Sequence, residues 1–221
     1  MNISALLEVE KGVTALIGGG GKTTLMYTMA EELRRRGTVI VTTSTHIQKP
    51  EQYPVLTAAD NVAAALAKHG AVCVASESPE GKLCAPALSF DTLAALADFV
   101  LVEADGSKRL PLKAHAPHEP VIPANARRTV YVVGADGFGH PIRQVCHRSE
   151  RYAALCGAAE DDIVPPALEA AVLHAEGYDT GWVYINKVET PSDWANAEAL
   201  AALLPGKAVA GSLWERRYRI L

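Results

Sequence analysis

The sequence is poor in cysteine, has no excess of positive charge and contains no long apolar run. Its four cysteines (Cys73, Cys84, Cys146 and Cys156) form no Cys-x-x-Cys pair, which argues against a zinc ribbon or a redox dithiol. A formal net charge of −4 predicts no nucleic-acid binding. No segment reaches the roughly 18 uninterrupted apolar residues of a membrane span, and the N-terminus lacks a signal-peptide pattern. We therefore expect a cytoplasmic protein that uses neither a membrane nor a nucleic acid.

The bulk composition predicts one globular α/β domain over residues 1–221. Hydrophobic residues make up 49% of the chain and charged residues 21%, a mixture that can bury a core. Short β-rich runs alternate with amphipathic patterns along the whole length, which indicates a mostly parallel sheet covered on both faces. Strands are expected at 13–17, 38–43, 71–75, 99–102, 129–133, 182–185 and 208–210. Helices are expected at 22–36, 89–97, 165–175 and 191–204.

Two further segments complete this outline. Thr57, followed three residues later by Asp60, indicates a helix start, and the helix is expected to run to about Lys68. The stretch 76–82 is polar and contains proline and glycine, so we expect a loop there.

A glycine-rich loop joins the first predicted strand to the first long helix. Its residues are Gly18, Gly19, Gly20, Gly21, Lys22, Thr23 and Thr24. Glycines let main-chain N–H groups turn toward phosphate oxygens, and the helix start adds unpaired amides and partial positive charge. Lys22 is expected to reach the β and γ phosphates, and the Thr23 hydroxyl to ligate magnesium. The sequence therefore predicts a three-layer P-loop NTPase fold that binds Mg²⁺ with GTP or ATP. A glycine turn without a ligand has no need of Lys-Thr-Thr.

Acidic residues end the predicted strand 99–102. An apolar strand that ends in an acid can hold magnesium opposite a phosphate loop, so Glu103 and Asp105 are candidate metal-binding or water-orienting residues. The alternative is a surface acid followed by an ordinary Asp-Gly turn. Thr42 is a further candidate magnesium ligand, and His46 a candidate contact to a phosphate or second substrate, because both follow or end the neighbouring strand.

The tetrapeptide Asn186-Lys187-Val188-Glu189 follows a late strand. It resembles the Asn-Lys-x-Asp signature with which many GTPases recognise guanine, with Glu189 in place of the aspartate. We therefore predict that Asn186, Lys187 and Glu189 contact the base, and favour GTP over ATP.

Residues 106–125 carry four prolines and two histidines with little periodicity, which is typical of a functional loop or lid. Cations and histidines in this region (Lys108, Lys113, His115 and His118) are candidates for binding an anionic second substrate or partner. A solvated basic loop is an equally good interpretation.

With these motifs the chain resembles the accessory proteins of selenium-dependent molybdenum hydroxylases, the YqeC family. The matching stretches are the glycine loop, 41–46, 102–108, 112–120, 147–148 and 186–187. The segment Glu-Ala-Asp-Gly-Ser-Lys at 103–108 is far more specific than the glycine loop. The resemblance implies a P-loop accessory protein that helps these hydroxylases mature, with the molybdenum cofactor or the hydroxylase as partner.

Three functions remain open on the sequence. The leading hypothesis is an NTP-hydrolysing accessory protein in which Lys22 stabilises the transferred phosphoryl group and Glu103 or Asp105 positions water. The second is a kinase or ligase acting on a small acidic substrate. The third is a nucleotide-sensing module without turnover.

Overall fold

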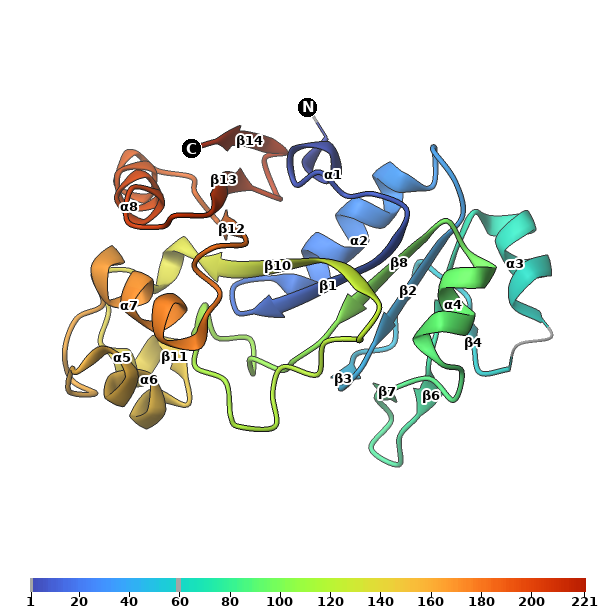
Figure 1. Ribbon diagram of the computed structural model, residues 1–221, viewed down its shortest axis with the longest axis horizontal. Coiled ribbons are helices and arrows are strands. Elements are labelled where there is room, and N and C mark those ends of the chain that lie inside the picture. Colours follow the sequence, from blue (N-terminus) through green and yellow to red (C-terminus); the bar gives the residue numbers. More distant parts are fainter. Residues whose placement is uncertain (1, 59–60) are drawn as a thin grey trace.

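A nine-stranded sheet forms the centre of the computed structural model, which describes residues 2–58 and 61–221 (Figure 1). Its strand order is β14-β13-β12-β10-β1-β8-β2-β5-β4, and all neighbouring strands run parallel except β13 and β14. The strands are β1 (Gly12–Gly18), β2 (Val39–Thr43), β4 (Val55–Leu56), β5 (Ala71–Val74), β8 (Phe99–Glu103), β10 (Ala126–Gly134), β12 (Trp182–Asn186), β13 (Lys207–Ser212) and β14 (Arg217–Ile220). All seven predicted strands are thus confirmed.

Helices cover both faces of the sheet. They are α1 (Ile3–Leu6), α2 (Lys22–Leu33), α3 (Val62–His69), α4 (Phe90–Leu96), α5 (Ile142–Val145), α6 (Ser149–Cys156), α7 (Pro166–Glu176) and α8 (Pro191–Ala201), with a 3₁₀ turn, η2 (Ala135–Gly137). Apolar residues of α1 and α2 share one core cluster with one side of the sheet. Those of α3 and α4 form a second cluster, and those of α5 to α8 a third, on the other side. The predicted three-layer α/β fold is confirmed.

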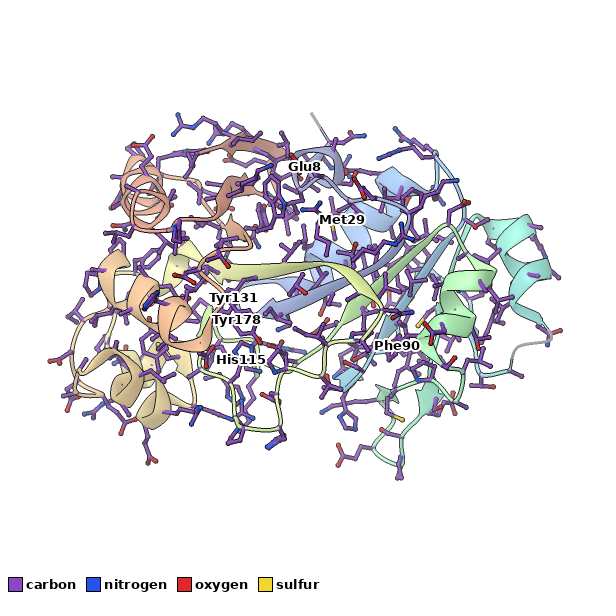
Figure 2. The ribbon with its side chains drawn as sticks, viewed as in Figure 1. Glu8, Met29, Phe90, His115, Tyr131 and Tyr178 are labelled. Carbon is purple, nitrogen blue, oxygen red and sulfur yellow. The ribbon has the colours of Figure 1, made fainter. Side chains whose placement is uncertain are left out.

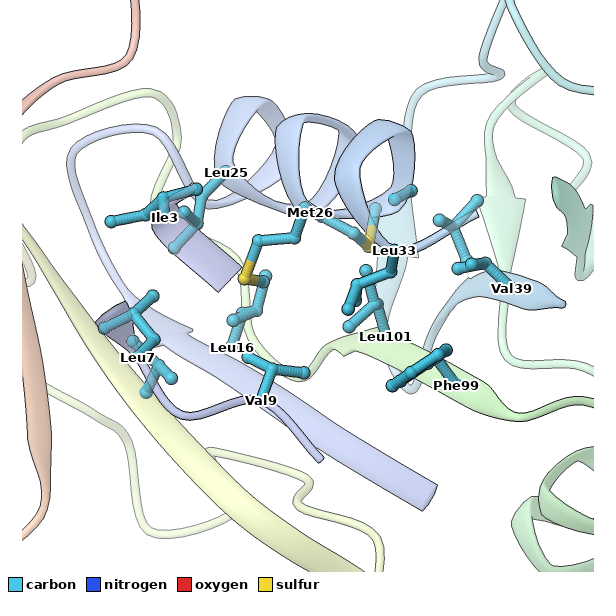
Figure 3. Packing of buried hydrophobic residues seen from close by; sticks show 14 of the residues in the cluster. Ile3, Leu7, Val9, Leu16, Leu25, Met26, Leu33, Val39, Phe99 and Leu101 are labelled. Atoms are coloured by element: carbon cyan, nitrogen blue, oxygen red, sulfur yellow. The ribbon is translucent and has the colours of Figure 1, made fainter. Parts of the chain in front are cut away.

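Helix α2 shows how sequence period produces this packing. Leu25, Met26 and Leu33 recur at helical spacing and are fully buried against the sheet residues Leu16 and Leu101 (Figure 3). Burying a side chain of this size stabilises the fold by about 1.5–3 kcal/mol. The packing fixes the start of α2 directly after the end of β1.

Two small sheets lie outside the large one. In the first, β7 (Leu83–Cys84) pairs antiparallel with both β3 (His46–Ile47) and β6 (Ser76–Glu77); in the second, β9 (Leu112–Lys113) pairs with β11 (Cys146–His147). The loop predicted at 76–82 was therefore wrong for its first two residues. Ser76 and Glu77 gain a hairpin partner in β7 across a short loop, a pairing that their polar character does not reveal. In the 57–68 helix prediction, Asp60 lies outside the described residues, and α3 begins at Val62.

The topology brings several strand ends to one place. Strand β1 lies between β8 and β10, and the chain builds β2, β4 and β5 on the β8 side before it crosses to the β10 side. Ligands of open parallel sheets bind at such a switch point, outside the carboxyl ends of the strands. Within the described residues, no helix is long and apolar enough to cross a membrane.

Candidate nucleotide site

Several backbone segments of the chain approach one another closely at the glycine loop. Gly18, Gly20 and Gly21 have φ values of 94°, 68° and 117°, a region that favours glycine. A Cβ on Gly19 would lie 2.4 Å from the carbonyl oxygen of Pro111, and one on Gly20 would lie 2.2 Å from the nitrogen of Gly134. The glycines are therefore required by the close approach of neighbouring backbone as well as by any ligand.

The N–H groups of the loop divide into two sets. Those of Gly18, Gly19 and Gly20 donate to the Asp105 carboxylate and to the carbonyls of Val132 and Leu110. Among the described residues, no protein acceptor takes the N–H groups of residues 21–24, the start of α2. Four unpaired amides at a helix start form a ready anion site. The N–H groups of Gly18, Gly19 and Gly20, which the sequence predicts to face a phosphate, are therefore engaged within the protein in this structure.

Lys22 is the first residue of α2, and 2% of its side chain is exposed. Its Nζ donates to the carbonyl oxygen of Gly18 at 2.6 Å and lies 3.0 Å from Asp105 Oδ1. The second contact is an ion pair without a hydrogen bond, since Oδ1 accepts none among the described residues. Asp105 balances the charge of this ammonium, while the unpaired amides of residues 21–24 leave partial positive charge at the helix start.

Asp105 is the centre of a buried ion network. Its Oδ2 accepts from Gly18 N at 2.8 Å and lies 2.6 Å from His115 Nε2 and 3.3 Å from Lys113 Nζ. His115 Nδ1 lies 2.6 Å from Glu176 Oε2. Burial alone would raise the pKa of Asp105, but Lys22, the hydrogen bond from His115 and Lys113 hold it below its ordinary value. Asp105 therefore carries a negative charge that is fully engaged by the protein's own cations.

His115 is enclosed by aromatic rings as well as by carboxylates. Figure 2 shows it beside Tyr131 and Tyr178, whose ring centroids lie 5.8 and 5.5 Å from its own. Burial lowers the pKa of His115, but its hydrogen bonds to Asp105 and Glu176 outweigh burial and raise it. The imidazole thus links the glycine loop, through Asp105, to the end of α7.

Lys113 extends the same network in another direction. Its side chain is fully buried, and its Nζ donates to Glu119 Oε2 at 2.8 Å and to the Gly106 carbonyl. Arg148 donates to the same Glu119 oxygen at 2.7 Å. The structure therefore places Lys113 and His115, predicted as partner-binding residues, inside the protein, and His118 on the surface.

The Thr23 hydroxyl donates to Glu103 Oε2 at 2.6 Å. Hydroxyl and carboxylate oxygens are the kinds of ligand atom that magnesium prefers. Burial raises the pKa of Glu103, against the lowering effect of Lys22 and Thr23. The structure does not bring Thr42 to this point: Thr42 is fully buried, and its hydroxyl donates to the carbonyl of Val74 on β5.

A cleft of about 520 Å³ lies over the loop. Its lining includes residues 21–24, His46, Glu103, Lys108, Arg109 and Lys187. Lys108 and Arg109 are exposed, have φ values of 50° and 64°, and make no ion pair with any described residue. Of the predicted second-substrate residues, the structure thus brings His46 and Lys108 to the phosphate loop.

The Asn-Lys-x-Glu segment forms the wall of an adjoining pocket. Asn186 Nδ2 donates to the Gly20 carbonyl at 2.7 Å, and its Oδ1 accepts from Leu213 N at 3.3 Å. Glu189 Oε1 accepts from the Ser212 hydroxyl at 2.8 Å. Lys187 pairs with Asp136 at 2.6 Å. Asn186 thereby ties the glycine loop to the ends of β12 and β13.

Sequence reasoning missed the residues that complete these contacts. Glu176 lies in the last turn of a helix, 61 positions from His115, and nothing local marks it as a partner. Ser212 and Trp214 follow a weak strand pattern. Their position could have indicated them, because residues that follow β13, the strand next to β12, must lie beside the Asn-Lys segment.

A parallel α/β sheet whose central strand runs into a glycine loop, an unpaired helix start and a buried lysine defines a P-loop nucleotide-binding protein. Residues 14–150 match the YqeC protein family. The chain belongs to that family.

Two individual proteins resemble the chain. The uncharacterized protein YqeC of Escherichia coli (strain K12) is 32% identical over an alignment of 178 residues, which covers 75% of this chain and 69% of that protein. The crystal structure of the 54 kDa signal recognition particle protein from Aeropyrum pernix K1, in complex with GDP, aligns at 15% identity with a TM-score of 0.42. That alignment covers 96% of this chain, which spans 44% of the length of the archaeal chain.

Proposed function

We propose that the chain binds a magnesium nucleoside triphosphate over the glycine loop and hydrolyses it, with GTP preferred over ATP. The observation that carries the proposal is the convergence of the unpaired amides of residues 21–24 with the Lys22 ammonium. Unpaired amides at a helix start together with a nearby ammonium favour a phosphate chain.

Thr23 and Glu103 fit a magnesium ion at the edge of this site. Among the described residues there is no group of three or more His, Cys, Asp or Glu side chains that would hold a metal without help. Magnesium characteristically takes one or two protein oxygens and completes its shell with phosphates and water. When bound, the ion neutralises charge on the β and γ phosphates.

The two acids then take different roles. Glu103 lines the cleft and is the residue we assign to orienting the attacking water. Asp105 pairs with Lys22 through Oδ1, and its Oδ2 is held by the Gly18 amide, Lys113 and His115. We assign Asp105 to positioning Lys22, which stabilises the charge on the transferred phosphoryl group.

The base is assigned to the pocket beside Asn186. Glu189 Oε1 is held by Ser212, which leaves its second oxygen for the N1–H and amino group of guanine. Adenine presents an acceptor at N1, which a carboxylate repels. This difference supports GTP as the substrate.

The resemblance to accessory proteins of selenium-dependent molybdenum hydroxylases supports placing this nucleotide chemistry in hydroxylase maturation. The molybdenum cofactor or the hydroxylase would then be the partner, and the 106–125 segment, which contacts the glycine loop through Leu110, would sense it. The 1–221 chain is proposed to act as one domain located in the cytoplasm.

The exposed, unpaired Lys108 and Arg109 favour one alternative: phosphoryl transfer to a small acidic acceptor held at the mouth of the cleft with His46. Product analysis separates the functions. Inorganic phosphate in solution supports hydrolysis, phosphate on a small molecule supports transfer, and tight binding without turnover supports a sensing module.

Lys22→Ala tests the nucleotide site itself. We expect at least about 100-fold weaker binding of MgGTP and MgATP, because two charge-assisted hydrogen bonds are lost. The fold should persist, since Asp105 keeps Lys113 and His115 as counter-charges. Calorimetry with Lys68→Ala, an exposed lysine on α3, as control measures this effect. Unchanged affinity in Lys22→Ala would contradict the proposed site.

A further inference from the structure

A second pocket, of about 560 Å³, adjoins the phosphate cleft. The two share Gly21, Thr24 and Lys187 in their linings, so one ligand can occupy both. Its volume lies in the range that holds small organic ligands in proteins. The far wall is formed by Ser212, Leu213 and Trp214, which lie at the end of β13 and in the turn after it.

Trp214 is the most exposed large hydrophobic side chain in the described part of the chain, at 91%. Covering an exposed indole with a flat apolar surface is favourable, because it removes apolar area from water. Other exposed apolar residues, such as Leu203 at 54%, line neither of these two pockets.

The turn that carries Trp214 is held in place by the predicted base-binding residues. Leu213 N donates to Asn186 Oδ1 at 3.3 Å, and the Ser212 hydroxyl donates to Glu189 at 2.8 Å. Glu215 N in turn donates to the Ser212 hydroxyl at 3.1 Å. The backbone on both sides of Trp214 is therefore tied to the segment 186–189, which places the residue at the rim of the pocket.

We propose that Trp214 is a specificity-determining residue of the nucleotide site: its indole stacks on the face of a guanine whose donor edge is read by Glu189. This inference rests on the proposed function, because it requires the phosphates to lie over the glycine loop. The carboxylate selects the base by its hydrogen-bonding edge, and the indole supplies affinity through its face. Stacking on an aromatic ring is worth about a tenfold or greater change in binding per base.

The chemistry of the walls favours guanine over other flat ligands. Two further acids line the pocket: Asp193 Oδ2 accepts from the N–H groups of Glu189 and Thr190 at the start of α8, and Asp136 Oδ2 accepts from Lys187. Glu189 Oε2 has no hydrogen-bond partner among the described residues. Glu189 therefore presents a free carboxylate oxygen in a pocket that Trp214 also lines, and guanine has both the donors and the face to match.

The experiment compares Trp214→Ala, Trp214→Phe and the control Leu203→Ala by calorimetry. The ligands are MgGTP, MgATP and magnesium tripolyphosphate, which has phosphates but no base. We expect Trp214→Ala to bind MgGTP about tenfold more weakly and tripolyphosphate as the wild type does. Trp214→Phe should stay within about threefold of the wild type, since a phenyl ring also stacks. GTP, but not tripolyphosphate, should change the tryptophan fluorescence of the wild type, and Trp214→Phe should lack that change.

Each outcome bears on a different claim. Wild-type affinity for MgGTP in Trp214→Ala would overturn the role of Trp214, and would leave its exposed indole as a docking point for a protein partner. Equal wild-type affinities for MgGTP and MgATP would overturn the guanine assignment. If the wild-type protein bound neither MgGTP nor magnesium tripolyphosphate, the proposed nucleotide site would be refuted.

Discussion

The two ends of the proposed nucleotide cleft are built in opposite ways. At the phosphate end, the side chains of Lys22, Asp105 and Lys113 are at most 2% exposed and form one ion network. At the base end, Lys187 and Asp136 are 42% and 45% exposed and form an isolated pair. The first arrangement is part of the protein's interior and exists before any ligand arrives. The second exposes its charged pair to solvent, so these residues can select a ligand at little cost to the fold.

The largest expected effect is on the stability contributed by the phosphate end. Asp105→Asn leaves Lys22, Lys113 and His115 without their shared counter-charge, so we expect the free energy of unfolding to fall by about 3–5 kcal/mol. The matched change at the base end, Asp136→Asn, removes an exposed pair and should cost at most about 1 kcal/mol.

Chemical denaturation at neutral pH measures both variants. Similar losses of stability in the two would show that the phosphate end is no more constrained than the base end, and the contrast between the two ends would fail.

The next effect is a pH dependence confined to the phosphate end. The folded-state pKa of His115 is raised, so its stabilising contribution is fully present below the unfolded value and is lost as the pH rises through the folded value. The groups facing His115 are Asp105 and Glu176, with Lys113 beside Asp105. We expect the free energy of unfolding to fall more steeply above about pH 6.5 in the wild type than in His115→Gln.

The difference between the two proteins is the quantity to measure, because a second group titrates nearby. Burial raises the pKa of Glu169 to about 8, against the lowering effects of its hydrogen bond with Tyr152 and of His115, so Glu169 also makes the free energy of unfolding change with pH in both proteins. Parallel curves for the wild type and His115→Gln would show that the imidazole carries no charge in the network.

The smallest expected effect belongs to the base end. Ser212→Ala removes the hydrogen bond that holds Glu189, so the carboxylate must be ordered when a base binds. We expect about three- to tenfold weaker binding of MgGTP, unchanged binding of MgATP and a loss of stability of at most about 1 kcal/mol. Competition calorimetry tests it; an equal loss for both nucleotides would mean that Glu189 does not read the base.

The same contrast explains what could be predicted from the sequence. The sheet, its major helices and the glycine loop follow from local patterns: period, glycine position and the Lys-Thr-Thr that begins α2. The burial of Lys113 does not, because a lysine in a proline-rich segment looks like a surface residue until Asp105 and Glu119 are placed around it. Residue type predicted cations near the site; whether they face inward or outward depends on long-range packing.

The residues at the carboxyl ends of the strands show how far the sequence predicts the direction of a single side chain. Neighbouring residues of a strand point to opposite faces, so a candidate at a strand end must also have the right parity. Residue type and strand position predict Thr42 as a magnesium ligand, but its hydroxyl contacts β5 instead of the loop. Glu103 has the required direction, as its contact with Thr23 demonstrates.

A crystal structure of the chain grown with excess MgCl₂ and a non-hydrolysable GTP analogue is the sharpest test of the phosphate site. We expect phosphate oxygens within hydrogen-bond distance of the N–H groups of residues 21–24 and of Lys22 Nζ, with a metal ion beside Thr23 and Glu103. An empty cleft, or phosphates bound elsewhere with Lys22 still held by Gly18 and Asp105, would contradict the proposed nucleotide chemistry.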